Sequence, residues 1–322
     1  MAKVGIPWGL LSYQYLPMWR TFLEALGAEV VVSKATTRQT LAQGSARVVA
    51  ETCLPVKVFI GHAIALAPEC DYLFIPSIKS VERRVFNCSK FLGLPDMVRA
   101  VVPEAPPIID ADIDVNQGQR ALYQAIYSLA RPFTWNPLRV REAARQAMEA
   151  HRQYFESMVQ DKKTPPQALG LAPEETPTPS QRFTLGVIGH PYVVHDDFVN
   201  HRLLPRLKGL GVRALTGEMV PEADLAQKVA QVEGRSYWTY EGEVVGAGVY
   251  YLDQPEVDGV IGVAAFGCGP DSLMVDLVKR HARQLGKPFL NLSLDEHTAE
   301  AGLMTRLEAF LDMIGRRKPR CG

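Results

Sequence analysis

Short apolar runs alternate with amphipathic segments along the first third of the chain. Apolar runs predict strands at residues 3–9, 29–33, 71–78 and 106–114. Between the first two strands, the segment 17–29 has the 3.6-residue apolar period of a helix that ends at Gly27. Thr36 or Thr37 caps a further helical pattern that continues up to Cys53. Strands separated by helical segments predict βαβ units and a parallel sheet.

The same alternation returns in the second half of the chain. Strands are predicted at 182–191, 212–218, 257–267 and 287–295, and helices at 196–211, 270–286 and 299–315. The two halves therefore share an architecture. The expected fold class is α/β, with two Rossmann-like (flavodoxin-like) lobes, each with a parallel sheet, and a cleft between them.

A long helical pattern at 137–160 is followed by no strand and leads into a stretch rich in Pro, Thr and charge at 161–181. The predicted domains are an N-terminal α/β lobe at 1–135, a connecting helix and Pro-rich linker at 136–181, and a C-terminal α/β lobe at 182–322. The long helix either packs against both lobes or forms a homodimer interface.

Composition narrows the class of protein. Of 322 residues, 47% are hydrophobic, which excludes wholesale disorder. The 35 basic and 35 acidic residues balance, so nucleic acid is not an expected partner. No apolar run approaches the ~20 residues that cross a bilayer, and the first residues lack a signal-peptide pattern, so a cytoplasmic protein is expected. Neither half carries a phosphate-binding glycine motif after its first strand.

Three of the five cysteines lie where ligands are commonly held in α/β proteins. Cys53 lies on a bend before Leu-Pro, whereas Cys88 and Cys268 follow predicted strands. Cys70 opens a strand at its amino end, and Cys321 is next to last, so a structural or tail role is expected for both. No C-x-x-C occurs, so the spacing predicts neither a zinc ribbon nor a ferredoxin cluster.

Five separated motifs carry a family resemblance over residues 3 to 314. They are ETCLPVKVFIGH, FNCSKFLGLPDMVR, GVIGHPYVVHDDFVN, AFGCGPDS and FLNLSLDEHTAEAGLMTRLEAFLD. The chain resembles the DUF2229 family, whose members are related to the D-component of 2-hydroxyglutaryl-CoA dehydratase and to benzoyl-CoA reductase subunits. These proteins also occur fused to, or encoded beside, an ATP-dependent activase.

The resemblance implies a cofactor and a partner. In the dehydratase relatives, three cysteines of a subunit hold one [4Fe–4S] cluster between α/β lobes, with one iron open. By motif, the ligands here would be Cys53, Cys88 and Cys268. Relatives with a double-cubane cluster use six cysteines, so a single cubane is favoured. A separate activase chain would deliver low-potential electrons, and the open iron would bind or reduce a small substrate. No segment of this chain is assigned to CoA, so acyl-CoA dehydration itself does not follow.

Other polar residues follow the strands of the second half. His190 could be a fourth ligand, a proton donor or a polar strand-end residue. Glu296 and His297 form an acid/base pair, or their segment simply caps the last helix. Three other functions stay open, namely a non-catalytic electron-transfer or scaffold partner, a two-lobe small-ligand binding protein, and a zinc site on the three cysteines.

Overall fold

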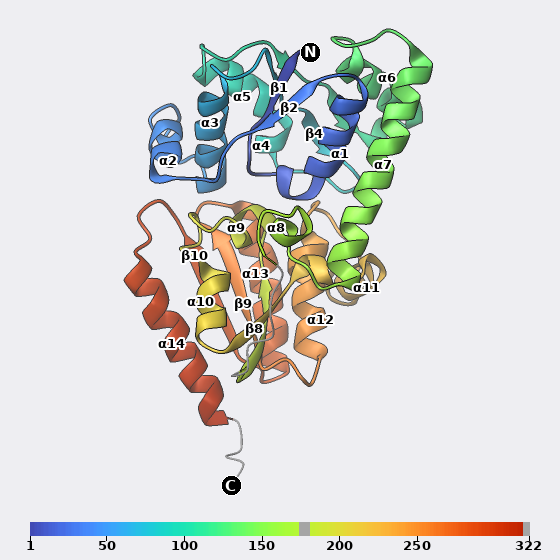
Figure 1. Ribbon diagram of the computed structural model, residues 1–322. Coiled ribbons are helices and arrows are strands. Elements are labelled where there is room, and N and C mark those ends of the chain that lie inside the picture. Colours follow the sequence, from blue (N-terminus) through green and yellow to red (C-terminus); the bar gives the residue numbers. More distant parts are fainter. Residues whose placement is uncertain (174–180, 318–322) are drawn as a thin grey trace. The chain divides into compact units, whose positions relative to one another are not determined.

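The computed structural model describes residues 1–173 and 181–317, so Cys321 lies outside the described part. The chain divides into two compact units (Figure 1). The first contains Met1–Ala172 and Tyr237–Thr239, and the second contains Pro173–Ser236 and Tyr240–Gly322. Both units are mixed α/β structures with parallel sheets, so the predicted fold class is confirmed. The three-part domain division remains a prediction.

The first unit is built around a four-stranded parallel sheet with the order β2-β1-β3-β5. Its elements are β1 (Lys3–Ile6), α1 (Ser12–Ala25), β2 (Glu29–Val32), α2 (Arg38–Ser45), α3 (Leu54–Leu66), β3 (Tyr72–Phe74), β4 (Ser77–Ser80), α4 (Ser89–Leu92), α5 (Leu94–Val101), β5 (Ile108–Ile109), β6 (Asp112–Asp114), η1 (Val115–Gln117), α6 (Gln119–Ala130), α7 (Pro137–Gln160) and α8 (Pro165–Ala168). The segment Tyr237–Thr239 joins this unit by exchanging backbone hydrogen bonds with Phe86.

The predicted single strands at 71–78 and 106–114 are each two strands. β3 and β5 pair in the main sheet, whereas β4 and β6 form a separate two-stranded parallel sheet. Pro76 lies between β3 and β4 and has no N–H to donate to a ladder. The apolar pattern continues through the proline, which is why the sequence predicted one strand.

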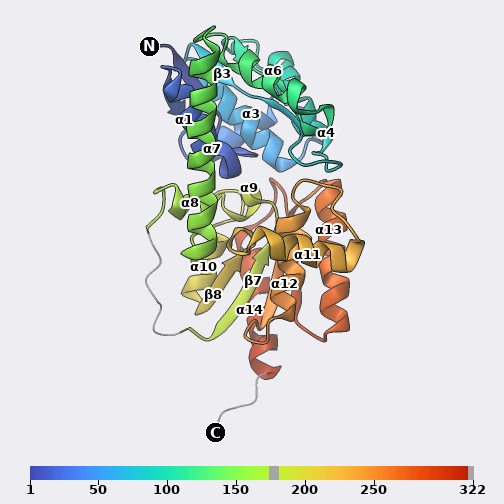
Figure 2. The ribbon, with the colours of Figure 1, turned by 90° about the vertical axis from the view of Figure 1, so that its right-hand side faces the viewer.

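The long helix α7 belongs to the first unit and lies along α1 (Figures 1 and 2). The Tyr154 hydroxyl donates to the backbone oxygen of Tyr13 at 2.6 Å, and the His151 ring stacks on Tyr15 at a centroid distance of 5.3 Å. Buried contacts of this kind attach the helix to α1 along its second half.

The second unit holds a four-stranded parallel sheet with the order β10-β9-β7-β8. Its elements are β7 (Phe183–Ile188), α9 (Pro191–Val194), α10 (Leu203–Gly209), β8 (Val212–Thr216), η2 (Gly217–Met219), α11 (Glu222–Glu233), the π-helix η3 (Gly242–Gly246), α12 (Ala247–Asp253), β9 (Gly259–Ala265), α13 (Gly269–Gln284), β10 (Phe289–Leu294) and α14 (Glu300–Arg317). The segment from α11 to α12 was not predicted.

Helices cover both faces of this sheet (Figure 2). Gly186 of β7 lies against Tyr251 of α12, and Gly248 of α12 lies against Val278 of α13. Phe183, at odd spacing from Gly186 along the same strand, lies on the other face near α14. Because both faces are covered, β9 is buried along its whole length, which explains its continuous apolar run.

The two sheets have the same strand order. In each sheet the second strand lies outside the first, and the third and fourth lie on the first strand's other side. The order therefore reverses between β1 and β3 in one unit and between β7 and β9 in the other. In open α/β sheets, ligands bind at the carboxyl ends of the strands at such a switch point. None of the described helices is long and apolar enough to cross a membrane.

Two glutamates meet at the end of α11. Burial and the neighbouring Glu241 carboxyl raise the pKa of Glu233 from its ordinary value of 4.5 to about 7. Glu241 itself is buried. Below pH 7 the pair can share a proton, whereas above it two negative charges meet.

This pair makes stability depend on pH. Between about pH 4.5 and about pH 7 the unfolded chain binds fewer protons than the folded chain at Glu233, so stability falls as pH rises through this window. We expect Glu233→Gln to have a higher melting temperature than the wild type at pH 8 but not at pH 4. Thermal melts at both values test this, with Glu308→Gln on the exposed face of α14 as control. An equal effect at both pH values would contradict the expectation.

Candidate metal centre

The exits of β7 and β9 lie side by side because a glycine follows β7. Gly189 has a φ of +154°, and a Cβ built there would lie 2.2 Å from the backbone oxygen of Val263 in β9. Only a residue without a side chain allows this approach. The next residue, His190, is thereby held beside the end of β9, where it is the N-cap of α9.

Cys268 lies at the corresponding exit of β9. Gly267 before it has a φ of +78°, which a residue with a side chain rarely adopts. Cys268 is the N-cap of α13, and its N–H donates to the Ala265 oxygen at 3.1 Å. A Cβ built at Gly269 meets nothing within 4 Å, so space is open in front of the helix. The half-buried thiol is thus held at a helix N-terminus with room beside it.

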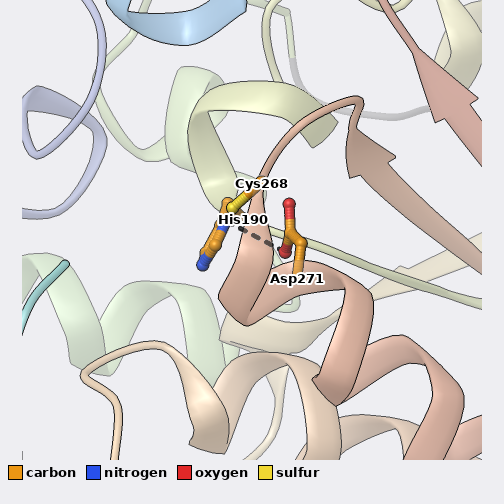
Figure 3. Close-up of side chains that lie close together, drawn as sticks. All are labelled: His190, Cys268 and Asp271. Carbon is orange, nitrogen blue, oxygen red and sulfur yellow. Dashed lines mark ion pairs between the residues drawn. The ribbon is translucent and has the colours of Figure 1, made fainter. Parts of the chain in front are cut away.

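His190, Cys268 and Asp271 form a cluster at this switch point (Figure 3). Their ligand atoms all lie within 4.8 Å of one another. The His190 Nδ1 lies 3.0 Å from Asp271 Oδ1, and the two side chains are 5% and 0% exposed. Figure 3 shows Cys268 and Asp271 at the start of α13, with the His190 ring beside them. These residue types are ligands of transition metals.

Aromatic rings fix the orientation of the histidine. The His190 ring stacks on Tyr192 at 5.0 Å and meets the edge of Tyr240 at 4.8 Å. Both tyrosines are buried. Rings packed on two sides leave the imidazole little freedom to rotate, so its Nδ1 stays directed at Asp271.

A second buried pair lies at the same edge of the sheet. His195 follows α9 and Glu218 follows β8, and His195 Nε2 lies 3.1 Å from Glu218 Oε1. Burial raises the pKa of Glu218, but the His195 charge and hydrogen bond outweigh burial, so the pKa is lowered below its ordinary value. The sequence analysis missed Glu218 and Asp271. The C-x-x-D spacing of Cys268 and Asp271 at a helix start was the available signal.

In the first unit, Cys53 and Cys88 are the N-caps of α3 and α4. Burial raises the pKa of Cys53, and the nearby Cys88 raises it further, while the Val56 N–H and the Lys90 charge act in the opposite direction. The electrostatic effect of Cys88 places it near Cys53. Two half-buried thiols thus lie close together at helix N-termini.

The predicted surroundings of Cys53 were partly wrong. The helix before it ends at Ser45, and Pro55 begins α3 rather than ending a helix. Proline is favoured in the first helical turn because the N–H it lacks has no partner there. Thr37 is the N-cap of α2, as the sequence predicted. The Lys57 ammonium, buried in α3, donates to the Ala50 oxygen at 2.8 Å.

The remaining candidates lie elsewhere. Glu296 and His297 are exposed in the turn after β10, where the His297 N–H donates to Asp295 Oδ1 at 2.9 Å. Their acid/base role stays a prediction. The Cys70 thiol donates to the Leu66 oxygen at 3.1 Å, and burial raises its pKa, which agrees with a structural cysteine. Whether Cys268 meets Cys53 and Cys88 also stays a prediction.

These features define an α/β protein of two units with cysteines at helix N-termini. Residues 3–220 match the family described as CoA enzyme activase uncharacterised domain (DUF2229), and the chain belongs to this family. Residues 218–314 match the 2-hydroxyglutaryl-CoA dehydratase D-component. The chain is therefore a 2-hydroxyacyl-CoA dehydratase-like component, and the predicted resemblance is confirmed.

Other comparisons add little. No curated protein matches the sequence. A solved structure described as a periplasmic sugar-binding protein from Pseudomonas fluorescens is similar at 13% sequence identity, over 99% of this chain and 96% of that one, with a TM-score of 0.24. A similarity at this TM-score carries no information about function.

Proposed function

We propose that this chain binds one [4Fe–4S] cluster through Cys53, Cys88 and Cys268. An ATP-dependent activase on a separate chain supplies low-potential electrons, and a small substrate binds or is reduced at an iron without a protein ligand. The observation that carries the proposal is the placement of all three cysteines at helix N-termini, two of them close together. Membership of an activase-related family supports the partner.

The donor set suits a cluster. Thiolates are the usual protein ligands of iron–sulfur clusters. A free thiolate is disfavoured at Cys53 because burial raises its pKa, whereas a bound cation stabilises the deprotonated sulfur. Backbone N–H groups at each helix N-terminus further stabilise negative charge on the thiolates and on a cluster. When bound, the cluster would supply one-electron transfer and an open coordination position.

Protein side chains would handle protons and orientation. His190 is buried beside Cys268 and is the first candidate to hold a proton near a bound substrate. Glu296 and His297 are exposed and could exchange protons with solvent. We propose all three as catalytic candidates, with His190 favoured by its fixed orientation.

Serine at either cysteine of the first unit should prevent cluster assembly. In anaerobically purified wild type we expect about four iron and four sulfide per chain, and in Cys53→Ser or Cys88→Ser less than about one. A serine oxygen is a poor replacement for a thiolate on iron. Cys70→Ser is the matched control and should keep the full complement, because Cys70 donates to a backbone oxygen.

Iron and acid-labile sulfide assays with visible absorption measure the outcome. Equal iron in both serine variants and the wild type would contradict the ligand assignment. Wild-type protein without iron and sulfide after anaerobic reconstitution would exclude the cluster.

The second candidate function is electron transfer without a substrate. His190 and Asp271 beside Cys268 could complete the coordination of a cluster and leave no open position. A closed cluster would keep the same electron paramagnetic resonance spectrum when cyanide is added. A cyanide-induced change would favour the open iron.

A further inference from the structure

The His190–Asp271 contact is short, but it is not a hydrogen bond. Nδ1 and Oδ1 lie 3.0 Å apart, yet among the described residues neither atom has a hydrogen-bond partner. Both side chains are at least nine-tenths buried. Buried polar atoms are nearly always satisfied, and an exception commonly marks a missing water or ion.

The geometry favours an ion over a direct hydrogen bond. Two ligands of a tetrahedral Zn²⁺, each about 2.0–2.1 Å from the metal, lie about 3.3 Å apart. Each ligand atom then points at the metal and not at the other ligand. A close but misaligned Nδ1 and Oδ1, with the Cys268 sulfur within 4.8 Å, is the arrangement that a shared ion requires.

Charge and neighbours support the same conclusion. A thiolate, a carboxylate and a neutral imidazole carry two negative charges together, which suits a divalent cation. The other Asp271 oxygen, Oδ2, accepts from the Ala265 N–H at 3.3 Å, and the His190 ring packs on Tyr192. Such contacts outside the ligand set hold metal ligands in position.

We propose that the second unit binds one divalent transition metal ion of the Zn²⁺ type through His190, Cys268 and Asp271. Three protein ligands leave a fourth position for water or a small ligand, as in catalytic zinc sites. Cys268 is only half buried, so this position is reached from solvent. The site goes beyond the proposed function because it needs neither Cys53 nor Cys88. It uses Cys268 in common with the cluster.

Cobalt titration of the full-length chain tests the site. In Cys53→Ser/Cys88→Ser protein, purified without metal and without oxygen, we expect one Co²⁺ per chain, a thiolate-to-cobalt absorption band and intense visible bands of tetrahedral Co²⁺. Zn²⁺ should displace the cobalt. Adding His190→Ala or Asp271→Asn to this background should weaken Co²⁺ binding at least tenfold.

Asp276→Asn is the matched control. Asp276 lies on the same helix with 44% of its side chain exposed, so its replacement should leave the cobalt spectrum and affinity unchanged. Circular dichroism confirms that each variant is folded, and a variant that is unfolded is replaced by His190→Gln or Asp271→Ser. No thiolate band in the parent, or unchanged affinity in both folded ligand variants, would overturn the proposal.

The two metal hypotheses fail separately. In the wild-type background, His190→Ala and Asp271→Asn should keep the iron and sulfide of the cluster while losing the cobalt site. Cobalt binding in the double serine variant, with no cluster in the wild type, would refute the proposed function alone. A cluster in the wild type, with no cobalt site in the double serine variant, would refute this inference alone.

Discussion

Replacing Cys268 with alanine is expected to remove all iron and sulfide while leaving the chain folded. In the proposed function, Cys268 is the ligand that the second unit contributes, and two cysteines of the first unit cannot hold a cluster alone. The fold should tolerate the change because the half-buried thiol makes no side-chain cap to α13. Iron should fall from about four per chain to less than about one.

The experiment compares anaerobically reconstituted Cys268→Ala, Cys70→Ala and wild type. Iron, sulfide and absorption report the cluster, and circular dichroism with size-exclusion chromatography reports the fold. Cys70→Ala controls for the loss of any thiol, since its sulfur is bonded to Leu66. A full iron complement in Cys268→Ala would refute the ligand assignment. Loss of iron from Cys70→Ala as well would point to general destabilisation.

Alanine at Gly61 is expected to disrupt the first unit. A Cβ built at Gly61 of α3 would lie 1.9 Å from the Thr40 oxygen of α2, and one at Gly44 of α2 would lie 1.8 Å from the Lys57 oxygen of α3. These are backbone atoms, so the two helices would have to separate. Overpacking in a core costs about 1–3 kcal/mol and occasionally more, and a backbone clash belongs at the upper end.

We therefore expect Gly61→Ala to lower the free energy of unfolding by about 3 kcal/mol or more. Gly302→Ala in α14 is the matched control, because its Cβ would meet nothing within 4 Å. Replacing this helical glycine should stabilise by up to about 1 kcal/mol. Urea unfolding followed by circular dichroism measures both. A wild-type midpoint in Gly61→Ala would contradict the close packing of α2 on α3.

The packing of α2 on α3 also concerns the metal centre. Cys53 is the N-cap of α3, so a displaced α3 would move this thiol relative to Cys88. A folded Gly61→Ala protein, if it forms, should therefore bind less iron than the Gly302→Ala control. The glycines of α2 and α3 position a ligand that neither of them touches.

Local patterns predicted the regular elements where one interaction dominates. The apolar run of β9 and the Thr37 cap were correct because burial on both faces and one side-chain cap decide them. The strand at 71–78 was wrong because Pro76 divides it between two sheets. The unpredicted π-helix Gly242–Gly246 depends on close packing: a Cβ at Gly246 would lie 2.6 Å from the Leu225 oxygen.

The candidate site was predicted in part for the same reason. Cys268 and His190 could be chosen from their positions after apolar strands, where ligands gather in α/β proteins. Asp271 could not be chosen, since an acidic residue in the first turn of a helix is usually explained by the helix dipole. Its burial and its contact with His190 depend on β7 and β9 being neighbours.

The sequence by itself determined the α/β class, the repeated architecture of the two halves, the family and the choice of candidate cysteines. These follow from hydrophobic periodicity and from motifs that are contiguous along the chain. The tertiary structure decided which side chains meet. Residues 190 and 271 become partners because the strand order makes the first and third strands adjacent and Gly189 allows their exits to touch. Such contacts depend on backbone approach between distant segments, which no local pattern encodes.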